Sequence, residues 1–270
     1  MSDTVSNTAN DMVLTERRGK VLEITLNRPK ANAINADMSM ALYDALATLR
    51  DDPELLCGII TAQGEKIFSA GWDLKAAAED GASEGDYQSP GGFAGITEMW
   101  DLNKPVIAAV NGVAVGGGFE IVLACDMVVA AEQASFFLPE TSLGVMADAG
   151  AVQRLPRKVP MNIALELLYT GRKMGAEEAA HYGLVNQVVP QEQLLEKARE
   201  MADVIAAGAP LSIMAIKEVI RDMENMTVKE AFDAITAREF PLHKAMLASE
   251  DHEEGPKAFA EKREPVWKGR

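Results

Sequence analysis

Short runs of apolar and β-branched residues mark the first two-thirds of the chain. These runs lie at 21–26, 57–61, 105–110 and 126–131. A short apolar run of this kind is typical of a strand that is buried on both faces of a sheet. Apolar residues recur at helical spacing over 38–50, and the glycines at 116–118 lead into another helical stretch. Strands that alternate with helices predict an α/β core.

The pattern changes after residue 190. From Gln191 onward, helical periodicity predicts four helices in succession, at 191–207, 210–223, 228–249 and 253–263. A purely helical section after an α/β core indicates a subdomain that packs elsewhere, on a neighbouring subunit. We therefore divide the chain into a polar, disordered lead-in at 1–12, an α/β core at 13–190 and a helical C-terminal region at 191–270.

The stretch from 75 to 95 has a different composition, dominated by Ala, Asp, Glu, Gly, Ser and Pro. Within it, Ser89–Gly92 reads Ser-Pro-Gly-Gly, which predicts no regular structure. We expect a long mobile loop, and such loops in compact domains often serve as lids or binding loops. A helix is predicted to follow at 95–102.

The chain of 270 residues carries a formal net charge of −15. This charge argues against nucleic acid or an anionic membrane as a partner. A polyanionic ligand would have to be met by a local basic patch or by helix N-termini. No apolar run reaches membrane-spanning length and no signal pattern opens the chain, so we expect a cytoplasmic protein. Cys57 and Cys125 lie in apolar stretches and are predicted to be buried, reduced thiols.

Several kinds of catalytic site are disfavoured by what the sequence lacks. The three histidines, His181, His243 and His252, have no metal-ligand spacing and no cysteine nearby, which argues against a zinc site. There is no G-x-S-x-G turn for an α/β-hydrolase nucleophile. The glycine run has no Lys or Ser/Thr of a phosphate-binding loop.

Two glycine turns remain as candidate chemistry. Gly116-Gly117-Gly118 directly follows a predicted buried strand, and a second turn, Ser69–Asp73, follows another short strand. The glycines could simply allow close packing of helix on strand. Alternatively, they let a substrate approach the backbone, whose N–H groups at a helix N-terminus then stabilise an oxyanion.

Two glutamates stand in unusual surroundings. Glu120 lies in the otherwise apolar helix Phe119–Ala124, where a carboxylate must find a partner or shift its pKa. Glu140 ends an apolar run at Phe136–Pro139. Either residue alone is more often a helix N-cap or a surface residue. Together with the glycine turns, they favour acid/base chemistry.

Five co-linear segments resemble the crotonase family, also called the enoyl-CoA hydratase/isomerase family. The segments are Asn27–Ile34, Phe68–Lys75, Lys104–Gly112, Gly116–Glu120 and Phe137–Glu140. The resemblance implies a crotonase-like α/β spiral of ββα units with a helical C-terminal trimerisation region, assembled as a homotrimer or a dimer of trimers. It also implies a hydratase or dehydratase that acts on an acyl-CoA thioester and uses no metal. Coenzyme A is part of the substrate, so no separate cofactor is expected.

The resemblance assigns roles residue by residue. The backbone N–H groups of Trp72 and Gly117 match the oxyanion hole, and Glu120 and Glu140 match the two carboxylates of hydratases. Family members that only isomerise tend to keep the second acid alone, so the pair favours water chemistry. The positions that match coenzyme A contacts are Arg28, Lys30, Ala70, Asp73, Leu74, Phe259 and Lys262. Each basic residue among them could equally be a solvated surface charge.

Three further stretches, at 69–79, 90–95 and 260–270, resemble a dehydratase branch whose acyl group carries a trimethylammonium. Trp72, Trp100 and Asp148 could hold such a cation in an acyl pocket. The family's proline and second glycine after Glu140 are absent here, which puts the substrate of this branch in doubt. The alternatives are a general enoyl-CoA hydratase, a crotonase-fold isomerase, decarboxylase or dehalogenase, and a non-catalytic acyl-CoA- or RNA-binding member of the family.

Overall fold

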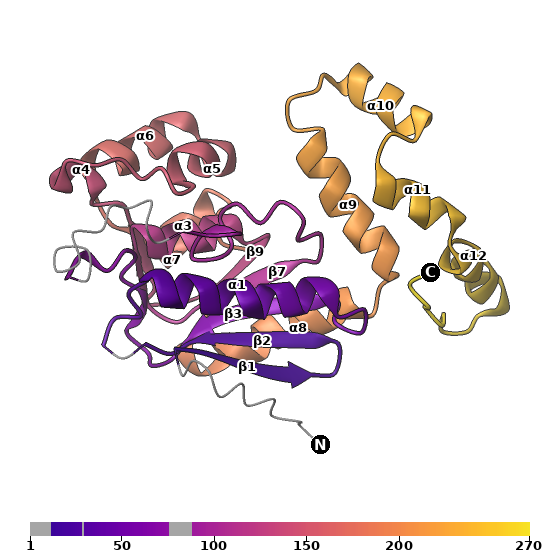
Figure 1. Cartoon of the computed structure of the whole chain (residues 1–270), viewed down its shortest axis with the longest axis horizontal. Helices are drawn as coiled ribbons and strands as arrows, with labels where there is room; N and C mark the ends of the chain where they lie inside the picture. Colours follow the sequence, from indigo (N-terminus) through magenta and orange to yellow (C-terminus); the bar gives the residue numbers. More distant parts are fainter. Residues whose placement is uncertain (1–11, 29, 76–87) are drawn as a thin grey trace.

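The computed structural model of the chain describes residues 12–28, 30–75 and 88–270 (Figure 1). Its larger sheet has six strands in the order β1-β2-β3-β7-β9-β12. The strands are β1 (Val13–Arg18), β2 (Val21–Leu26), β3 (Cys57–Ala62), β7 (Val106–Val110), β9 (Met127–Ala131) and β12 (Gln187–Val189). β1 and β2 form an antiparallel hairpin, and every later neighbour is parallel.

A smaller sheet of four strands has the order β11-β10-β8-β4. Its strands are β4 (Ile67–Ser69), β8 (Val113–Val115), β10 (Ser135–Phe137) and β11 (Met174–Gly175). β4, β8 and β10 run parallel to one another, whereas β11 is antiparallel to β10. A third, two-stranded sheet pairs β5 (Gln88–Ser89) with β6 (Gly92–Phe93).

Alternating side chains of the larger sheet enter two separate apolar clusters. Ile60 and Ala108 face the cluster that includes α1 (Ala36–Asp51), while Ile59 and Ile107 face α8 (Leu194–Ala206). Helix α1 covers its face with Met38, Leu42, Leu46 and Leu49, and α8 covers the other with Leu194, Ala198, Ala202 and Ala206. Because both faces are covered, the central strands β7 and β9 need apolar residues at every position, which explains their continuous apolar runs.

The remaining helices fall into two groups. Those of the core are α3 (Gly117–Ala124), α4 (Glu140–Leu143), α5 (Ala151–Lys158), α6 (Met161–Thr170) and α7 (Ala176–His181). A 3₁₀ turn, Gln191–Gln193, precedes α8. The helices after α8 are α9 (Pro210–Asp222), α10 (Val228–Ala237), α11 (Pro241–Ala248) and α12 (Glu250–Glu261). We call α9–α12 and the tail 262–270 the arm, because it extends away from the core, with α9 packed on α11 (Figure 1).

The strands predicted at 21–26, 57–61, 105–110 and 126–131 are confirmed as β2, β3, β7 and β9. The helices predicted over 38–50 and after the glycines are confirmed as α1 and α3. Both cysteines are buried and free, as predicted, and burial raises the pKa of each thiol to about 12. Over the described ranges, no helix is both long enough and apolar enough to cross a bilayer. The lead-in at 1–12 lies outside the described residues except for Met12.

Three local predictions are wrong. Residues 95–102 form successive turns rather than a helix, because Ala94 and Gly95 adopt positive φ angles of 53° and 70°. The single helix predicted at 228–249 is two helices, since Arg238 is left-handed and Phe240 is held extended before Pro241. Ser89–Gly92 belongs to the β5–β6 hairpin and packs near α1. Of the loop expected at 75–95, residues 76–87 lie outside the described part of the chain.

The helices of the region predicted from residue 191 pack in two different places, one on the larger sheet and the others in the arm. Helix α8 packs its alanine-rich face on the larger sheet, so it belongs to the core in three dimensions. The arm begins only after α8, at Pro210. In the tail, Trp267 donates its indole N–H to the carbonyl of Ala207 (2.9 Å), and Gly269 donates its N–H to Asp251 (2.9 Å). The tail thus ties α12 back to the end of α8.

Candidate active site

Three parallel strands of the smaller sheet end at the same place. β4 leads into the turn at Gly71, β8 into Gly116 and β10 into Glu140. Strands that run parallel bring their carboxyl ends to one edge of a sheet, where sites in α/β folds commonly lie. The three motifs singled out in the sequence therefore meet through the register of β4, β8 and β10.

The two glycine turns touch each other backbone to backbone. A Cβ added to Gly71 would lie 2.7 Å from the Gly117 nitrogen and 2.6 Å from the Val115 carbonyl oxygen. A Cβ on Gly118 would lie 2.3 Å from the carbonyl oxygen of Ser69. The close-packing interpretation is confirmed: Gly118 allows α3 to pack on β4, and Gly71 lets the second turn reach Gly117. The approach of a substrate to these N–H groups stays a prediction.

Gly117 is the first residue of α3, and its helix cap Gly116 has φ 52° and ψ −122°. The first N–H groups of a helix have no partner within the helix and carry its positive dipole end. Trp72 follows Gly71 and is held by a bridge to Ile34, with the Ile34 N–H donating to the Gly71 carbonyl at 2.7 Å. The structure thus brings Trp72 and Gly117, the two predicted oxyanion-hole residues, to adjoining turns.

Glu120 lies on the first turns of α3 and is only 3% exposed. Its carboxylate oxygen Oε1 accepts a hydrogen bond from the backbone N–H of Ala151 at 2.9 Å. Ala151 is the first residue of α5, so this carboxylate faces the positive end of a second helix. The burial and the helix terminus together show how an apolar helix accommodates an acid.

Glu140 reaches the same turn from the other side. It opens the short helix α4, and its oxygen Oε1 lies 2.5 Å from where a Cβ on Gly116 would be. The Gly116 N–H donates to the carbonyl of Phe137 at 2.9 Å, which fixes the turn against β10. The glycine at 116 leaves room for this carboxylate and adopts the positive φ of the turn. Glu140 therefore lies against the turn that opens α3, and Glu120 lies one turn along that helix from the Gly117 amide.

Two of the expected coenzyme A residues bind each other. Arg28 pairs with Asp73, with 2.6 Å between Nη2 and Oδ2, and donates from Nη1 to the Ala33 carbonyl at 2.8 Å. Because one edge of the guanidinium is engaged in this way, a phosphate would meet an Arg28 already fixed by its neighbours. Ala70 lies next to them, since its N–H donates to the carbonyl of Ala31 at 2.9 Å.

The other expected coenzyme A residues are exposed. Lys30 has a positive φ of 83° and lines a pocket of about 620 Å³ with Lys66 and Gln63. Leu74 is 47% exposed, and Phe259 is 88% exposed. Phe259 lies on α12 of the arm and Lys262 directly follows that helix, which Figure 1 shows well apart from α4. Within one chain, the structure does not bring these two together with the rest.

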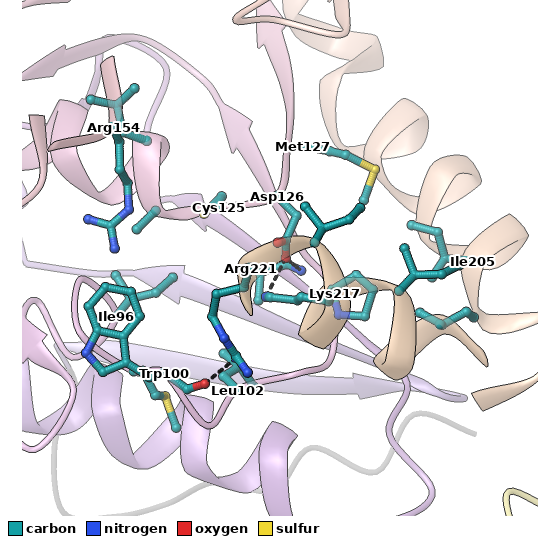
Figure 2. A pocket seen from close by; sticks show the side chains of 18 of the residues that line it. Ile96, Trp100, Leu102, Cys125, Asp126, Met127, Arg154, Ile205, Lys217 and Arg221 are labelled. Carbon is teal, nitrogen blue, oxygen red and sulfur yellow. Dashed lines mark hydrogen bonds and ion pairs between the residues drawn. The ribbon is translucent and has the colours of Figure 1, made fainter. Parts of the chain in front are cut away.

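The residues of the suggested cation pocket lie in different settings. Trp100 lines a pocket of about 750 Å³ between the core and α9, and the guanidinium carbon of Arg154 lies 5.6 Å from its ring centroid (Figure 2). One resident cation thus already lies over Trp100. Asp148 is exposed on the segment between α4 and α5 and is not among the residues that line this pocket. Trp72 packs partly buried against the main apolar cluster.

Three contributors to the site were missed from the sequence, the Ala151 N–H, Arg154 and Phe93. The sequence signal for Ala151 is the glycine before it, Gly150, which the structure shows at the start of α5 with a φ of 138°. Arg154 follows one turn later, and its electrostatic attraction to Glu120 opposes the lowering of its pKa by burial. The ring of Phe93 covers Gly117 so closely that a Cβ there would be 2.5 Å away.

Comparisons with known proteins place this geometry in a family. The model of the enoyl-CoA hydratase/isomerase family matches residues 16–270. Carnitinyl-CoA dehydratases from Salmonella heidelberg (strain SL476) and Salmonella typhimurium (strain LT2) are 56% identical over 254 residues, which is 94% of this chain and 97% of theirs. The solved enoyl-CoA hydratase from Mycobacterium tuberculosis H37Rv has a TM-score of 0.88 at 39% identity, over 97% of this chain and 100% of that one. The enoyl-CoA hydratase from Bacillus anthracis has a TM-score of 0.86 at 36% identity, over 96% of this chain and 100% of that one. The chain therefore belongs to the enoyl-CoA hydratase/isomerase family.

Proposed function

We propose that this protein adds or removes water across the α,β double bond of an enoyl-CoA thioester. The observation that carries the proposal is that the Glu140 carboxylate lies against the turn at Gly116, which opens α3 with the Gly117 amide, while the buried Glu120 lies one turn along the same helix. Acyl transfer alone would need one nucleophile, whereas addition of water to a double bond needs two proton-transfer groups near one oxyanion site.

In the proposed mechanism, the thioester carbonyl accepts hydrogen bonds from the N–H groups of Trp72 and Gly117. These donors stabilise the enolate-like transition state, and each such donor is worth about 3 kcal/mol in comparable sites. During hydration, the oxygen of a water molecule bonds to the β-carbon while Glu120 accepts a proton from that water. Protonated Glu140 gives a proton to the α-carbon. The net change is addition of one water molecule, and dehydration is the reverse.

For the acyl group, we propose the carnitine type, so that the reaction interconverts carnitinyl-CoA and crotonobetainyl-CoA. The support is the 56% identity to proteins named carnitinyl-CoA dehydratase, over 94% of this chain. The Salmonella relatives also match at 97% of their own length, so the likeness includes the arm. A trimethylammonium would meet Trp72, Trp100 and Asp148 only if the free face of Trp100 turned toward the site, since Arg154 lies over the ring.

We also infer that coenzyme A lies between chains of a homotrimer or a dimer of trimers. Apolar side chains on α9 and α10, such as Ile220 and Phe232, are 63% and 67% exposed in the single chain. Phe259 on α12 and Lys262 at the end of that helix belong to the same arm, which lies apart from α4 of its own chain (Figure 1). An arm that covers a neighbouring core would bury these apolar side chains and bring Lys262 to a neighbour's coenzyme A.

The first test is kcat/KM for crotonobetainyl-CoA and crotonyl-CoA, measured side by side on the purified protein. We expect a preference of about a hundredfold for the betaine substrate, equivalent to about 2.7 kcal/mol of transition-state discrimination. Equal rates would leave a general enoyl-CoA hydratase. No turnover of either substrate would point to an isomerase, decarboxylase or dehalogenase.

The role of the two carboxylates is tested with Glu120→Gln and Glu140→Gln. Each change is expected to lower kcat by about 10²- to 10⁴-fold, because it removes one proton-transfer group while keeping the shape. The matched control is Glu132→Gln, which alters an exposed glutamate of the core and should leave kcat unchanged. Full activity in both site variants would refute the mechanism.

A further inference from the structure

Arg154 lies on the same helix terminus that holds Glu120. The N–H of Ala151, the first residue of α5, donates to Glu120, and Arg154 follows three residues later in the next turn. The Arg154 side chain folds back toward the start of α5, because its Nη1 occupies the space beside Gly150, the residue before Ala151. The start of α5 therefore brings a cation next to the backbone N–H that binds Glu120.

The guanidinium of Arg154 is fixed by its surroundings. Its Nη2 donates to the carbonyl of Thr97 at 2.5 Å, and its Cζ lies 5.6 Å from the centroid of the Trp100 ring. In Figure 2, the Arg154 side chain points from α5 toward Trp100 and Ile96 rather than out to solvent. Its Nη1 lies 2.4 Å from where a Cβ on Gly150 would be, so the glycine leaves the room that this rotamer needs.

The charges around Glu120 come from two neighbouring elements. Glu140 on α4 faces the same glycine turn and is a like charge, whereas Arg154 on α5 is an opposite charge that Glu120 attracts. Cys125, Glu98 and Glu224 also face Arg154. Burial raises the pKa of Cys125 to about 12, so this thiol is neutral near pH 7 and only the two glutamates add negative charge there. Burial lowers the pKa of Arg154, but an arginine remains charged in any protein environment. Glu120 therefore has a permanent positive charge close by.

We propose that Arg154 is a positioning residue that orients Glu120 and keeps its carboxylate ionised beside Glu140. This inference rests on the function proposed above, in which Glu120 must accept a proton from water. Two carboxylates that share a site cannot both ionise easily, so one of them becomes the acid. Arg154 on the Glu120 side decides which one: Glu120 stays the base and Glu140 stays the acid.

The test compares Arg154→Met, Arg154→Lys and Arg157→Met. Arg157 is the matched control, because it lies three residues further along α5, is exposed and pairs with Glu224 at 2.6 Å. In R154M, the acidic limb of the pH profile of kcat/KM should move up by about one pH unit. At pH 7, kcat should fall about ten- to a hundredfold while KM changes little. R154K should restore the pH profile in large part, and R157M should behave as wild type.

A second readout does not depend on turnover. The titration of Glu120 can be followed by NMR in protein labelled with ¹³C at the glutamate carboxyl, with the signal assigned from E120Q. Its midpoint should lie about one pH unit higher in R154M than in wild type or R157M. An unmoved midpoint in folded R154M would overturn the inference, even if activity fell. A moved midpoint in a protein that turns over no enoyl-CoA would instead keep the inference and reject the proposed function.

Discussion

The core and the arm of this molecule are held together in different ways. In the core, continuous apolar strands lie between α1 and α8, and the site is built from backbone turns in direct contact. The arm has few buried side chains, and its α11 has none. Its order comes from caps, ion pairs and the tail that folds back on Ala207 and Asp251.

Because of this difference, substitutions in the core and in the arm should have different effects. Where the two turns of the core meet, a single added methyl group has no room and would force backbone atoms apart. A change in the arm removes one hydrogen bond or ion pair and leaves the core intact. We therefore expect core substitutions to affect chemistry and stability together, and arm substitutions to affect coenzyme A binding and assembly alone.

The largest effect is expected from Gly71→Ala, with Gly144→Ala as its matched control. Both glycines have a φ of 76°, so both variants meet the same left-handed strain of about 1–2 kcal/mol. Only at Gly71 would the new Cβ also meet backbone, 2.6 Å from the Val115 oxygen, whereas nothing lies within 4 Å at Gly144. Overpacking adds about 1–3 kcal/mol. Gly71→Ala should lower both Tm and kcat/KM, whereas Gly144→Ala should lower only Tm.

A smaller effect, confined to the arm, is expected from Asp251→Asn. This carboxylate is 5% exposed and accepts hydrogen bonds from the N–H groups of Lys268 (2.7 Å) and Gly269 (2.9 Å). Loss of the charge should cost about 1–2 kcal/mol of tail stability. Hydrogen exchange should speed up at 264–270 and stay unchanged in the larger sheet. Asp233→Asn, which alters an exposed i,i+4 pair, is the control; faster exchange in the sheet would contradict the separation of core and arm.

Trp267→Phe should have a similar but weaker effect. The change keeps an aromatic ring against Gly255 and removes only the hydrogen bond from Nε1 to the Ala207 carbonyl (2.9 Å). A hydrogen bond between neutral groups contributes about 1 kcal/mol. Limited proteolysis of the tail should become faster, with kcat unaltered. If kcat and kcat/KM fell by the same factor, the tail would act on the chemical step after all.

The smallest effect concerns Glu254, whose pKa is held at about 2 by hydrogen bonds from Arg263 and the Val266 N–H. A carboxyl group with a lowered pKa in the folded protein stabilises it above the unfolded pKa of about 4.3, and this contribution is lost as pH falls toward 2. The pair lies at the surface, with 18% of the Glu254 side chain and 36% of the Arg263 side chain exposed, so solvent screening keeps the effect small. The Tm difference between wild type and Glu254→Gln should shrink from pH 6 to pH 3, and 1 M salt should reduce it at pH 6. A difference independent of pH would rule out this cause.

Much of the fold could be predicted because local patterns and tertiary packing agree there. The runs that became β7 and β9 are apolar at every position, as burial on both faces requires. The failures lie where one residue overrides periodicity. Pro241 broke a helix that the apolar pattern of 228–249 continued through, and positive φ angles at Ala94 and Gly95 replaced a helix by turns.

By itself, the sequence determined which residues could do chemistry: two glutamates in apolar surroundings, and glycine turns after short strands. Only the tertiary structure decided that these residues meet, because the shared direction of β4, β8 and β10 brings three strand ends to one edge. It also decided that the Ala151 N–H donates to Glu120, that Arg154 interacts electrostatically with Glu120, and that Arg28 pairs with Asp73. The physical reason is that hydrogen bonds and charges act over a few ångströms, while the partners lie tens of residues apart in the chain. Periodicity records which face of an element is buried, and it holds no information on what that face will meet.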